Sequence, residues 1–308
     1  VKSNVLTVKD NHKKEEYKIL WRTTNDGLSF SEVYTFEEPI SSVAVSRSNP
    51  YKIVVGTRGC MYYSTDMGNT FKKYDLPEEM TYTINYKVAI HPKNENEIWV
   101  SDNNPGGMWV TKDNGVTWKK YDEGLTFASW DNTIATHQIG RFFLTGNEKN
   151  AVYAVAFTMG YLNERYTTPR GRLIYRDDTT NGWVDLHEGL PKVMVLNRLL
   201  PFYKEGVVRL ATNNGIWERD LVDKDFAPIA QPLLLNVGSG DNTSSTYPQE
   251  IQLESYSIVN QTNAEWKWDI YPEPLYISSK TERNPVMRIE SDQTYDISLT
   301  VTTAEGTD

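Results

Sequence analysis

The sequence STDMGNTF at residues 64–71 is repeated in closely similar form at residues 111–118 as TKDNGVTW. Both copies place a hydroxyl residue, an acid, a glycine, a second hydroxyl residue and an aromatic residue at the same positions. An Asp side chain can accept hydrogen bonds from the backbone of its own turn, and glycine adopts the positive φ that a tight turn requires. The pattern therefore predicts a turn locked by its own acid, followed by a strand. The residues with this structural role are Ser64, Asp66, Gly68, Thr70, Phe71, Thr111, Asp113, Gly115, Thr117 and Trp118.

The acid of this pattern is a poor candidate for binding calcium, because each copy supplies one carboxylate. Calcium needs about 6–8 oxygen ligands. The single cysteine and the four scattered histidines make no metal-ligand spacing either. We therefore expect no metal site and no cofactor.

Three further segments align with the two copies and are less complete. The first has Asn25 at the position of the acid. The second keeps Asp178 and Trp183 but loses the central glycine, and the third has lost most of the pattern. These segments are ILWRTTNDGLSF at 19–30, LIYRDDTTNGW at 173–183 and GIWERDLVD at 215–223.

The spacing of the five segments is typical of propeller blades. Equivalent residues lie 41, 47, 65 and 43 positions apart, and a four-stranded blade takes about 40–50 residues. Ahead of three copies, two alternating apolar runs are separated by a polar turn, so each unit supplies four antiparallel strands. The locked turn falls between the third and the fourth strand, and the longest step predicts an insertion. The equivalent residues are Trp21, Tyr62, Trp109, Ile174 and Trp217.

These segments resemble the Asp-box (BNR) repeats of sialidases, xyloglucanase-type glycoside hydrolases and Vps10/sortilin-like receptors, all of which are β-propellers. The resemblance covers residues 1–222. It implies an all-β fold with a partial propeller of about four to five four-stranded blades. It also places the Asp-box turns on the rim, away from the ligand face. We expect the N-terminal blades to lie upstream in the same parent chain or on a partner.

The remaining sequence predicts a linker and a second, smaller module. Residues 223–249 are rich in Pro, Gly, Ser and Asn, with one apolar stretch from Pro232 to Leu235 that we expect to dock on the propeller. Residues 250–308 alternate as in a small β-sandwich.

Within 250–308, a W-x-W-D sequence, an Asn-Pro pair and a Y-D-I-S-L run resemble a PKD domain, an Ig-like fold. The closing strand of such a domain is expected beyond residue 308. Because alternation points every second side chain inward, we expect Trp266 and Trp268 to pack in the core, in preference to stacking on sugars. The chain also begins without an initiator Met or an apolar signal core, so we interpret it as a piece of a longer protein.

Composition excludes several classes of partner and site. The net charge is −9 and the pI is about 5.1, so we expect no nucleic acid and no anionic bilayer as partner. No apolar run reaches the ~20 residues of a membrane helix, so we expect no membrane span. One cysteine excludes an internal disulfide framework.

The ligand face of a propeller is formed by the loops between the second and third strands and by the connections between blades. Aromatic rings beside acids and amides in these loops suit sugar recognition, since rings stack and polar groups bind hydroxyls. We therefore expect a ligand at the following residues: Asp102, Asn103, Trp130, Asp131, Tyr161, Glu164, Arg165, Tyr166 and Arg170.

The function that follows is a bacterial cell-surface or secreted protein that binds a glycan or a surface protein, with no identifiable catalytic motif. The alternative is a glycoside hydrolase of xyloglucanase or sialidase type acting on extracellular polysaccharide, with Asp102, Asp131 and Glu164 as the carboxylates to test. The F/Y-R-I-P segment of sialidases does not occur in the sequence. A Vps10-like sorting receptor is expected to carry disulfide-rich segments after the propeller, and the single cysteine weighs against it.

Overall fold

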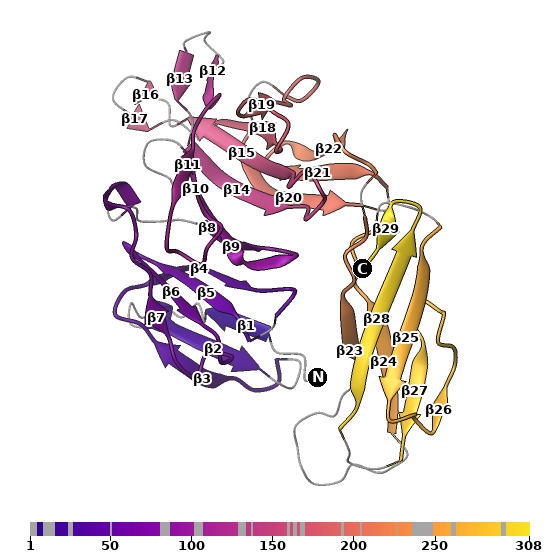
Figure 1. Ribbon diagram of the computed structural model, residues 1–308. Helices are drawn as coiled ribbons and strands as arrows, with labels where there is room; N and C mark the ends of the chain where they lie inside the picture. The colour runs from indigo at the N-terminus through magenta and orange to yellow at the C-terminus, as the bar shows by residue number, and fades with distance from the viewer. Residues whose placement is uncertain are drawn as a thin grey trace.

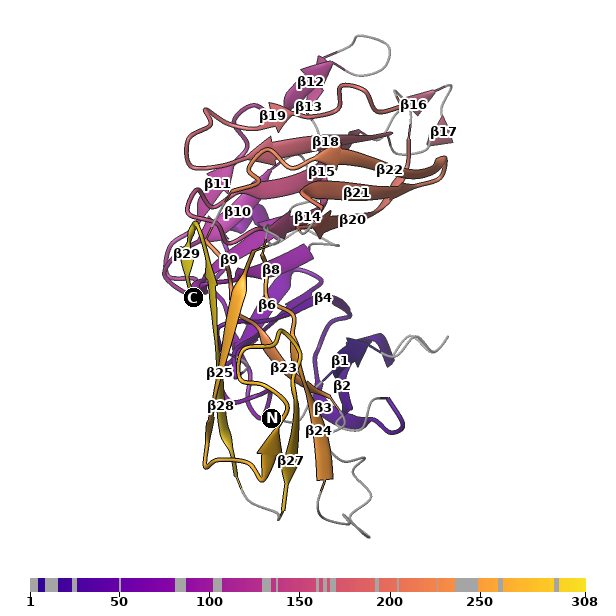
Figure 2. The ribbon, with the colours of Figure 1, turned by 90° about the vertical axis from the view of Figure 1, so that its right-hand side faces the viewer.

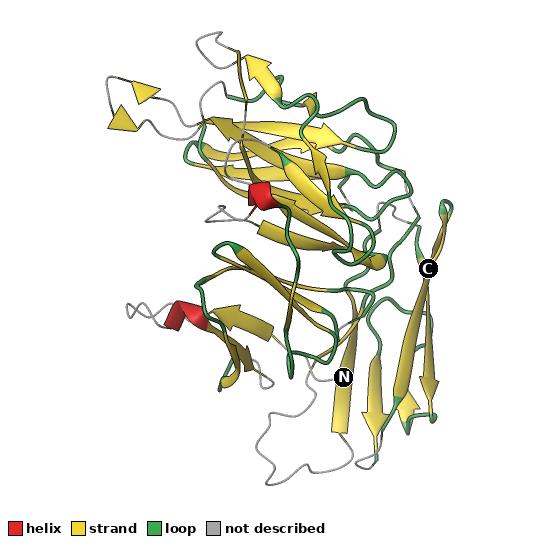
Figure 3. Cartoon of the chain, turned by 60° about the vertical axis from the view of Figure 1, so that its left-hand side comes forward, coloured by secondary structure: helices red, strands yellow, loops and turns green. Residues whose placement is uncertain are grey.

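The regular secondary structure of the chain is almost entirely β-strand, as the sequence predicts. The two helices of the described region are three-residue 3₁₀ turns, η1 (Glu16–Lys18) and η2 (Glu78–Met80), and no described helix is long and apolar enough to cross a membrane. Figure 3 shows how strands dominate the chain. The computed structural model describes residues 5–308 except 9–15, 24–26, 50, 81–86, 102–106, 129–133, 137, 159–160, 163–164, 167–169, 192–193, 204, 226, 236–248, 260–262 and 291–293.

Three four-stranded antiparallel sheets form the centre of the first part of the chain. Their strand orders are β4-β5-β6-β7, β8-β9-β10-β11 and β14-β15-β18-β19. These orders confirm the predicted four-stranded units. The strands are β4 (Ile40–Val45), β5 (Ile53–Thr57), β6 (Cys60–Ser64), β7 (Lys72–Lys73), β8 (Lys87–His91), β9 (Asn94–Ser101), β10 (Met108–Thr111), β11 (Lys119–Tyr121), β14 (Gln138–Leu144), β15 (Val152–Thr158), β18 (Arg170–Arg176) and β19 (Val184–Asp185).

Two three-stranded sheets flank these three, and two small hairpins lie within the 65-residue step of the sequence repeat. The flanking sheets have the orders β1-β2-β3 and β20-β21-β22, and the hairpins are β12-β13 and β16-β17. The strands are β1 (Val5–Val8), β2 (Ile19–Thr23), β3 (Ser31–Thr35), β20 (Leu196–Phe202), β21 (Val207–Thr212), β22 (Gly215–Asp220), β12 (Thr126–Ala128), β13 (Ile134–Thr136), β16 (Tyr161–Leu162) and β17 (Arg165–Tyr166).

The five sheets follow one another in an arc, and their first strands lie along its inner edge (Figures 1 and 2). Contacts between neighbouring sheets are concentrated on β4, β8, β14 and β20. Between β4 and β8, for example, the backbone N–H of Val88 donates to Oγ of Ser42 at 3.1 Å. The inner strands therefore determine how successive sheets are placed.

The second strand of each four-stranded sheet in the arc is largely buried on both faces, because the sheet lies between two neighbours. In β5, Ile53 and Val55 pack toward the first sheet, whereas Val54 packs toward the third. In β15, Val152 packs toward the preceding sheet and Tyr153 packs toward the following one. This explains why these strands are apolar at consecutive positions instead of alternating.

Two further sheets at the C-terminal end share one apolar core. Their orders are β23-β24-β27-β26 and β25-β28-β29. Exposure alternates along β25, and Trp268 is fully buried while Trp266 is half-buried on the same side, as expected for core residues. The strands are β23 (Pro232–Leu235), β24 (Gln249–Ser255), β25 (Glu265–Tyr271), β26 (Tyr276–Ile277), β27 (Val286–Ile289), β28 (Asp296–Thr303) and β29 (Gly306–Thr307).

The interpretation of residues 223–249 as a linker needs correction. The stretch Pro232–Leu235 forms β23, which pairs in antiparallel register with β24 and so belongs to the C-terminal sheet. Pairing with β24 satisfies the backbone hydrogen bonds on one side of β23, which is an edge strand of that sheet. Within this region, Ile229 packs against the arc, where it clusters with Ile258 and Tyr203.

Candidate functional site

The turn at residues 64–71 is held by its own side chains, as the sequence pattern indicates. Oδ1 of Asp66 accepts the backbone N–H of Thr70 at 2.9 Å and the hydroxyl of Ser64 at 2.7 Å, and Oδ2 accepts the hydroxyl of Thr70 at 2.6 Å. Oγ of Ser64 accepts the N–H of Gly68 at 2.8 Å. Gly68 has a φ of 89°, a value that favours glycine.

The second copy repeats this geometry. Oδ1 of Asp113 accepts the N–H of Thr117 at 2.8 Å, and Oδ2 accepts its hydroxyl at 2.6 Å. In both copies the side-chain and backbone hydrogen bonds from the Thr lower the pKa of the Asp from the ordinary 3.8 to about 2. A general acid needs a pKa near the working pH, so neither Asp66 nor Asp113 is suited to that role at neutral pH.

The related segment at residues 173–183 uses a different acid from the one predicted. The sequence alignment assigns Asp178 to the turn, but Asp177 holds it: Oδ1 of Asp177 accepts the N–H of Thr179 at 2.8 Å and that of Thr180 at 2.9 Å. Asp178 instead accepts a hydrogen bond from Asn150. Without the central glycine the chain makes a shorter turn that starts one residue earlier. In the segment at residues 19–30, the N–H of Gly27 donates to Oγ1 of Thr23, and Asn25 lies outside the described residues.

Each locked turn also docks on the preceding sheet, which the sequence analysis missed. A Cβ added at Gly68 would lie 2.7 Å from Cγ1 of Val33, and one at Gly115 would lie 2.2 Å from Cδ1 of Tyr74. The glycines are therefore required by a close approach as well as by their φ. No short sequence pattern reveals this docking, because the residue that each glycine approaches lies tens of positions upstream.

Buried polar groups hold the second copy in place. Asn114 in this turn has a φ of 60°, and its Oδ1 accepts hydrogen bonds from Nζ of Lys52 and, at 2.8 Å, from the hydroxyl of Tyr74. Lys52 is 2% exposed, and burial lowers its pKa. This turn of the third sheet is thus held by two side chains of the second.

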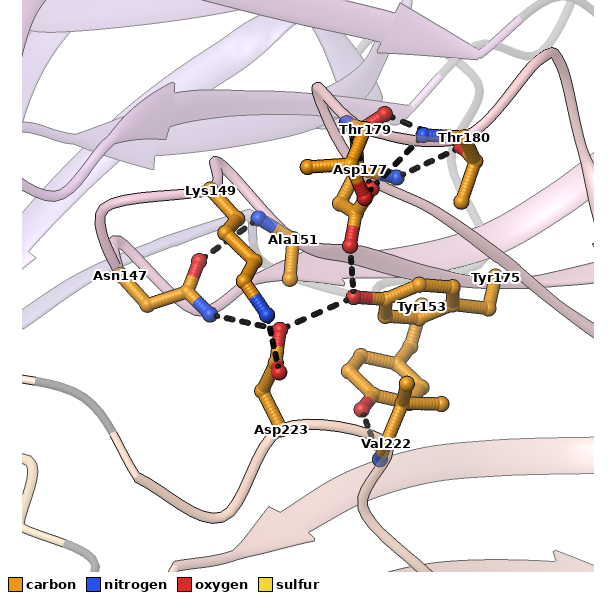
Figure 4. Close-up of polar contacts among 10 residues, drawn as sticks. All are labelled: Asn147, Lys149, Ala151, Tyr153, Tyr175, Asp177, Thr179, Thr180, Val222 and Asp223. Carbon is orange, nitrogen blue, oxygen red and sulfur yellow. Dashed lines mark hydrogen bonds and ion pairs between the residues drawn. The ribbon is translucent and has the colours of Figure 1, made fainter.

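A larger polar network joins the fourth sheet to the segment that follows β22 (Figure 4). The hydroxyl of Tyr175 lies 2.6 Å from Oδ2 of Asp177 and 3.2 Å from Oδ2 of Asp223. Nζ of Lys149 pairs with Oδ1 of Asp223 at 2.7 Å. The hydroxyl of Tyr153 accepts the N–H of Val222 at 2.7 Å.

The network has the electrostatics of a structural joint. Burial, the hydrogen bond to Asp177 and the charge of Asp223 raise the pKa of Tyr175 far above its ordinary value. Burial raises the pKa of Asp177, but hydrogen bonds from Tyr175 and Thr179 outweigh it, so the net pKa is lowered. These pKa values move away from neutrality, whereas an acid–base pair would need them closer to it.

The turn between β14 and β15 contributes further contacts to this joint. Nδ2 of Asn147 donates to Asp223 at 3.5 Å, and Oε1 of Glu148 accepts the N–H of Ala227 at 3.2 Å. A Cβ at Gly146 would lie 2.5 Å from Cδ1 of Ile229. With Lys149, four consecutive turn residues therefore contact the segment that leads to the C-terminal sheets.

The predicted ligand residues are only partly placed. Tyr161 lies in β16, Arg165 and Tyr166 in β17, and Arg170 is the first residue of β18, so the backbone brings these four together around one hairpin. The residues outside the described part of the chain are Asp102, Asn103, Trp130, Asp131 and Glu164.

A small pocket lies where the turns of the second and third sheets meet the C-terminal segment. Its volume is ≈ 150 Å³, and it is lined by Arg47, Lys93 and Ile229 among others. Ligand pockets usually measure about 300–1,000 Å³, so this one is too small for a sugar chain. Within the described residues, no group of three His, Cys, Asp or Glu side chains is placed to hold a metal ion.

Comparison with known sequences identifies one family. The profile of Sortilin-Vps10, described as sortilin, neurotensin receptor 3, matches residues 18–195. Sortilin from Danio rerio is 27% identical over 128 residues, which cover 37% of this chain and 15% of that protein. The chain therefore corresponds to a small part of the length of this relative.

Solved structures with similar folds are distant in sequence. The GH74 xyloglucanase from Xanthomonas campestris aligns with 12% identity and a TM-score of 0.49, over 79% of this chain and 41% of that one. An ancestral GH74 enzyme aligns with 15% identity and a TM-score of 0.47, over 82% of this chain and 38% of that one. YCF48 from Cyanidioschyzon merolae aligns with 12% identity and a TM-score of 0.41, over 93% of this chain and 95% of that one.

Proposed function

The chain belongs to the Sortilin-Vps10 family, and from this premise we propose that it is a non-catalytic recognition module that binds a glycan or a protein partner. The expectation that the single cysteine weighs against this family was wrong. The matched residues 18–195 form the sheets, whereas the disulfide-rich segments of such receptors are expected after the propeller.

The observation that carries the proposal is the pair of hairpins added to the arc of sheets. Strand β12 pairs with β13, and β16 pairs with β17. Each hairpin is a separate two-stranded sheet, so among the described strands neither extends one of the larger sheets. Both project beyond the larger sheets at the upper end of Figures 1 and 2. Loops held on a rigid scaffold commonly carry binding residues. The sequence of these excursions contains most of the residues expected to contact a ligand.

The acids of the locked turns support a non-catalytic role. Asp66, Asp113 and Asp177 each accept several hydrogen bonds within their own turns, and the pKa of each is lowered. Glycoside hydrolysis usually requires one carboxyl group with a raised pKa and a second as nucleophile or base. These three carboxylates are committed to holding the backbone.

The C-terminal sheets fit the same proposal as a display element. Their two-layer core, with Trp268 at its centre, has the packing of a small sandwich, and we assign it to a PKD-like module. Such modules accompany extracellular enzymes and adhesins, so the proposal places the protein outside the cell or on a bacterial surface. Cell fractionation of the producing organism tests this location.

Binding and turnover assays on the full-length parent protein test the proposed function. A glycan array is probed with the wild type, with Tyr161→Ala plus Tyr166→Ala, and with Tyr51→Ala as control. Tyr51 is an exposed tyrosine (55%) in the turn before β5, remote in the chain from the hairpins. We expect the hairpin variant to lose binding and the control to retain it.

The same experiment includes hydrolysis of the polysaccharides from which the bound glycans derive. No turnover is expected. Turnover that Asp102→Asn or Glu164→Gln abolishes would replace the binding proposal with the glycoside hydrolase alternative. Equal binding by the hairpin variant and the wild type would show that the ligand site lies elsewhere.

A further inference from the structure

Three cationic residues lie on the first strands of three consecutive sheets. Lys87 begins β8, Arg141 lies in the middle of β14, and Arg198 lies near the start of β20. We call these residues the inner cationic cluster. Two of the three are half-buried, and Arg198 is exposed.

Strand register gives Arg141 and Arg198 equivalent positions in their sheets. Each is the first paired residue after a one-residue bulge, opposite Val155 in the middle of β15 and Ala211, the last but one residue of β21. Lys87 lies opposite Ser101, the last residue of β9. The ends of these second strands are where the loops to the third strands begin, and one of those loops carries the hairpin β16-β17.

The three side chains are close enough to repel one another. Burial lowers the pKa of Lys87, and Arg141 and Arg198 lower it further. Burial and the charge of Arg198 lower the pKa of Arg141. Strand β14 contacts both β8 and β20, which brings these groups together across two sheet boundaries.

Among the described residues, no carboxylate offsets this repulsion. Neither guanidinium of the cluster makes an ion pair with a described acid, and Nζ of Lys87 donates to the backbone carbonyl of Ser41 at 3.1 Å. Four other arginines of the sheets are paired with acids. These pairs are Arg172 with Asp185, Arg176 with Glu123, Arg209 with Glu218 and Arg288 with Glu250.

Gathered like charges destabilise a fold, and a bound anion relieves the repulsion. The chain as a whole carries a net charge of −9, so the cluster is a local feature and does not follow from the composition. Two guanidinium forks and one ammonium supply several donors from three directions, which suits the three free oxygens of a sulfate or phosphate ester better than the two of a carboxylate.

We infer that the inner cationic cluster of Lys87, Arg141 and Arg198 is a binding site for a sulfate or phosphate ester carried by a saccharide. This inference rests on the proposed function and names the ligand class. The ester binds at the inner edge of the arc, and the remainder of the saccharide reaches the loops and hairpins at the same end.

Calorimetric titration of the full-length protein tests the inference with four probes: sodium sulfate, sodium phosphate, a sulfated oligosaccharide and its desulfated counterpart. Each is titrated into the wild type, Arg198→Gln and Arg288→Gln. Arg288→Gln is the matched control, because it removes one exposed arginine from the C-terminal sheet and changes the net charge equally. Arg198→Gln is expected to weaken binding of the sulfated oligosaccharide about tenfold, and the control is expected to leave it unchanged.

A second measurement separates a binding role from a structural one. Without ligand, Arg198→Gln is expected to raise the thermal unfolding midpoint, because it relieves repulsion on Lys87 and Arg141. A residue that holds the fold together would lower it. Rising salt is expected to weaken binding by the wild type.

The outcomes distinguish this inference from the proposed function. Binding of sulfate or phosphate alone, lost in Arg198→Gln, supports the site and assigns it to the free anion. Failure of every oxyanion probe to bind, or unchanged affinity in Arg198→Gln, overturns the inference, and the hairpin variants then still test recognition of neutral glycans. Oxyanion binding that depends on Arg198, accompanied by hydrolysis of the oligosaccharide, overturns the proposed function and leaves the site standing.

Discussion

Trp183, just before β19, donates its indole N–H to the backbone carbonyl of Tyr121, the last residue of β11 in the preceding sheet, at 3.1 Å. Trp118 makes the equivalent bond to the carbonyl of Asp75 one sheet earlier, at 3.2 Å. The aromatic residue of the locked turn is therefore a joint between sheets as well as a cover for its own sheet. Two consecutive sheet boundaries use the same device.

Substitution of the more buried indole is expected to destabilise the protein more. Trp183 is 4% exposed, and Trp183→Phe removes its hydrogen bond and part of its packing, so we expect a loss of about 1–3 kcal/mol in the free energy of unfolding. Urea titration measures it. Trp118→Phe serves as control, because Trp118 is only half-buried and its substitution should cost less. Equal losses would contradict the importance of burial at this joint.

Glycine at the second locked turn is required by space as well as by backbone conformation. Gly115 has a φ of 86°, and its Cβ would lie 2.2 Å from Tyr74, so Gly115→Ala is expected to destabilise by roughly 2–5 kcal/mol. Gly189 has a φ of 82° with no atom within 4 Å of its added Cβ. Gly189→Ala should therefore cost only the backbone strain, about 1–2 kcal/mol. Thermal unfolding compares the two, and similar shifts would argue against the close approach.

The stability that the locked turns contribute is expected to fall as the pH is lowered. The folded-state pKa of Asp66 and Asp113 is about 2, below the ordinary 3.8, so each carboxylate contributes stability that is complete above about pH 4. That contribution is lost as the pH falls through about 2. Unfolding of the wild type and of Asp66→Asn plus Asp113→Asn is measured at pH values from 2 to 6. The variant should be less stable at pH 6, and its stability should change less between pH 4 and 2; parallel curves would refute the assignment.

The joint between the fourth sheet and the C-terminal segment depends on Asp223. Asp223→Asn weakens the pair with Lys149, so the segment after β22 is expected to become more sensitive to protease. Asp220→Asn is the matched control, because its pair with Lys224 is more exposed and lies outside the joint. Limited proteolysis followed by mass spectrometry measures cleavage between 221 and 230. Equal cleavage of both variants would show that the joint does not depend on Asp223.

The sequence predicted those features whose interactions are local. The turns at 64–71 and 111–118 close hydrogen bonds within eight residues, so their residue types alone indicate their geometry. Strand order within each four-stranded sheet followed from consecutive apolar runs separated by short turns. The burial of Trp268 followed from alternation along a single strand.

Predictions were wrong where an alternative register or partner was available. Asp177 and Asp178 are adjacent acids, and the repeat alignment favoured the second, although the first accepts the hydrogen bonds of the turn. Pro232–Leu235 looked like an isolated apolar stretch, because its partner β24 begins at Gln249, beyond a polar segment.

What the sequence by itself determined is the β-class of the chain, the repeat and the chemistry of each locked turn, because these depend on residues that are neighbours in the chain. Only the tertiary structure decided which sheet each turn docks on, that Asp223 reaches Tyr175, and that Lys87, Arg141 and Arg198 approach one another on neighbouring first strands. Those relationships join residues about 50 positions apart, the length of a blade. They are fixed by the packing of whole sheets, which no local pattern encodes.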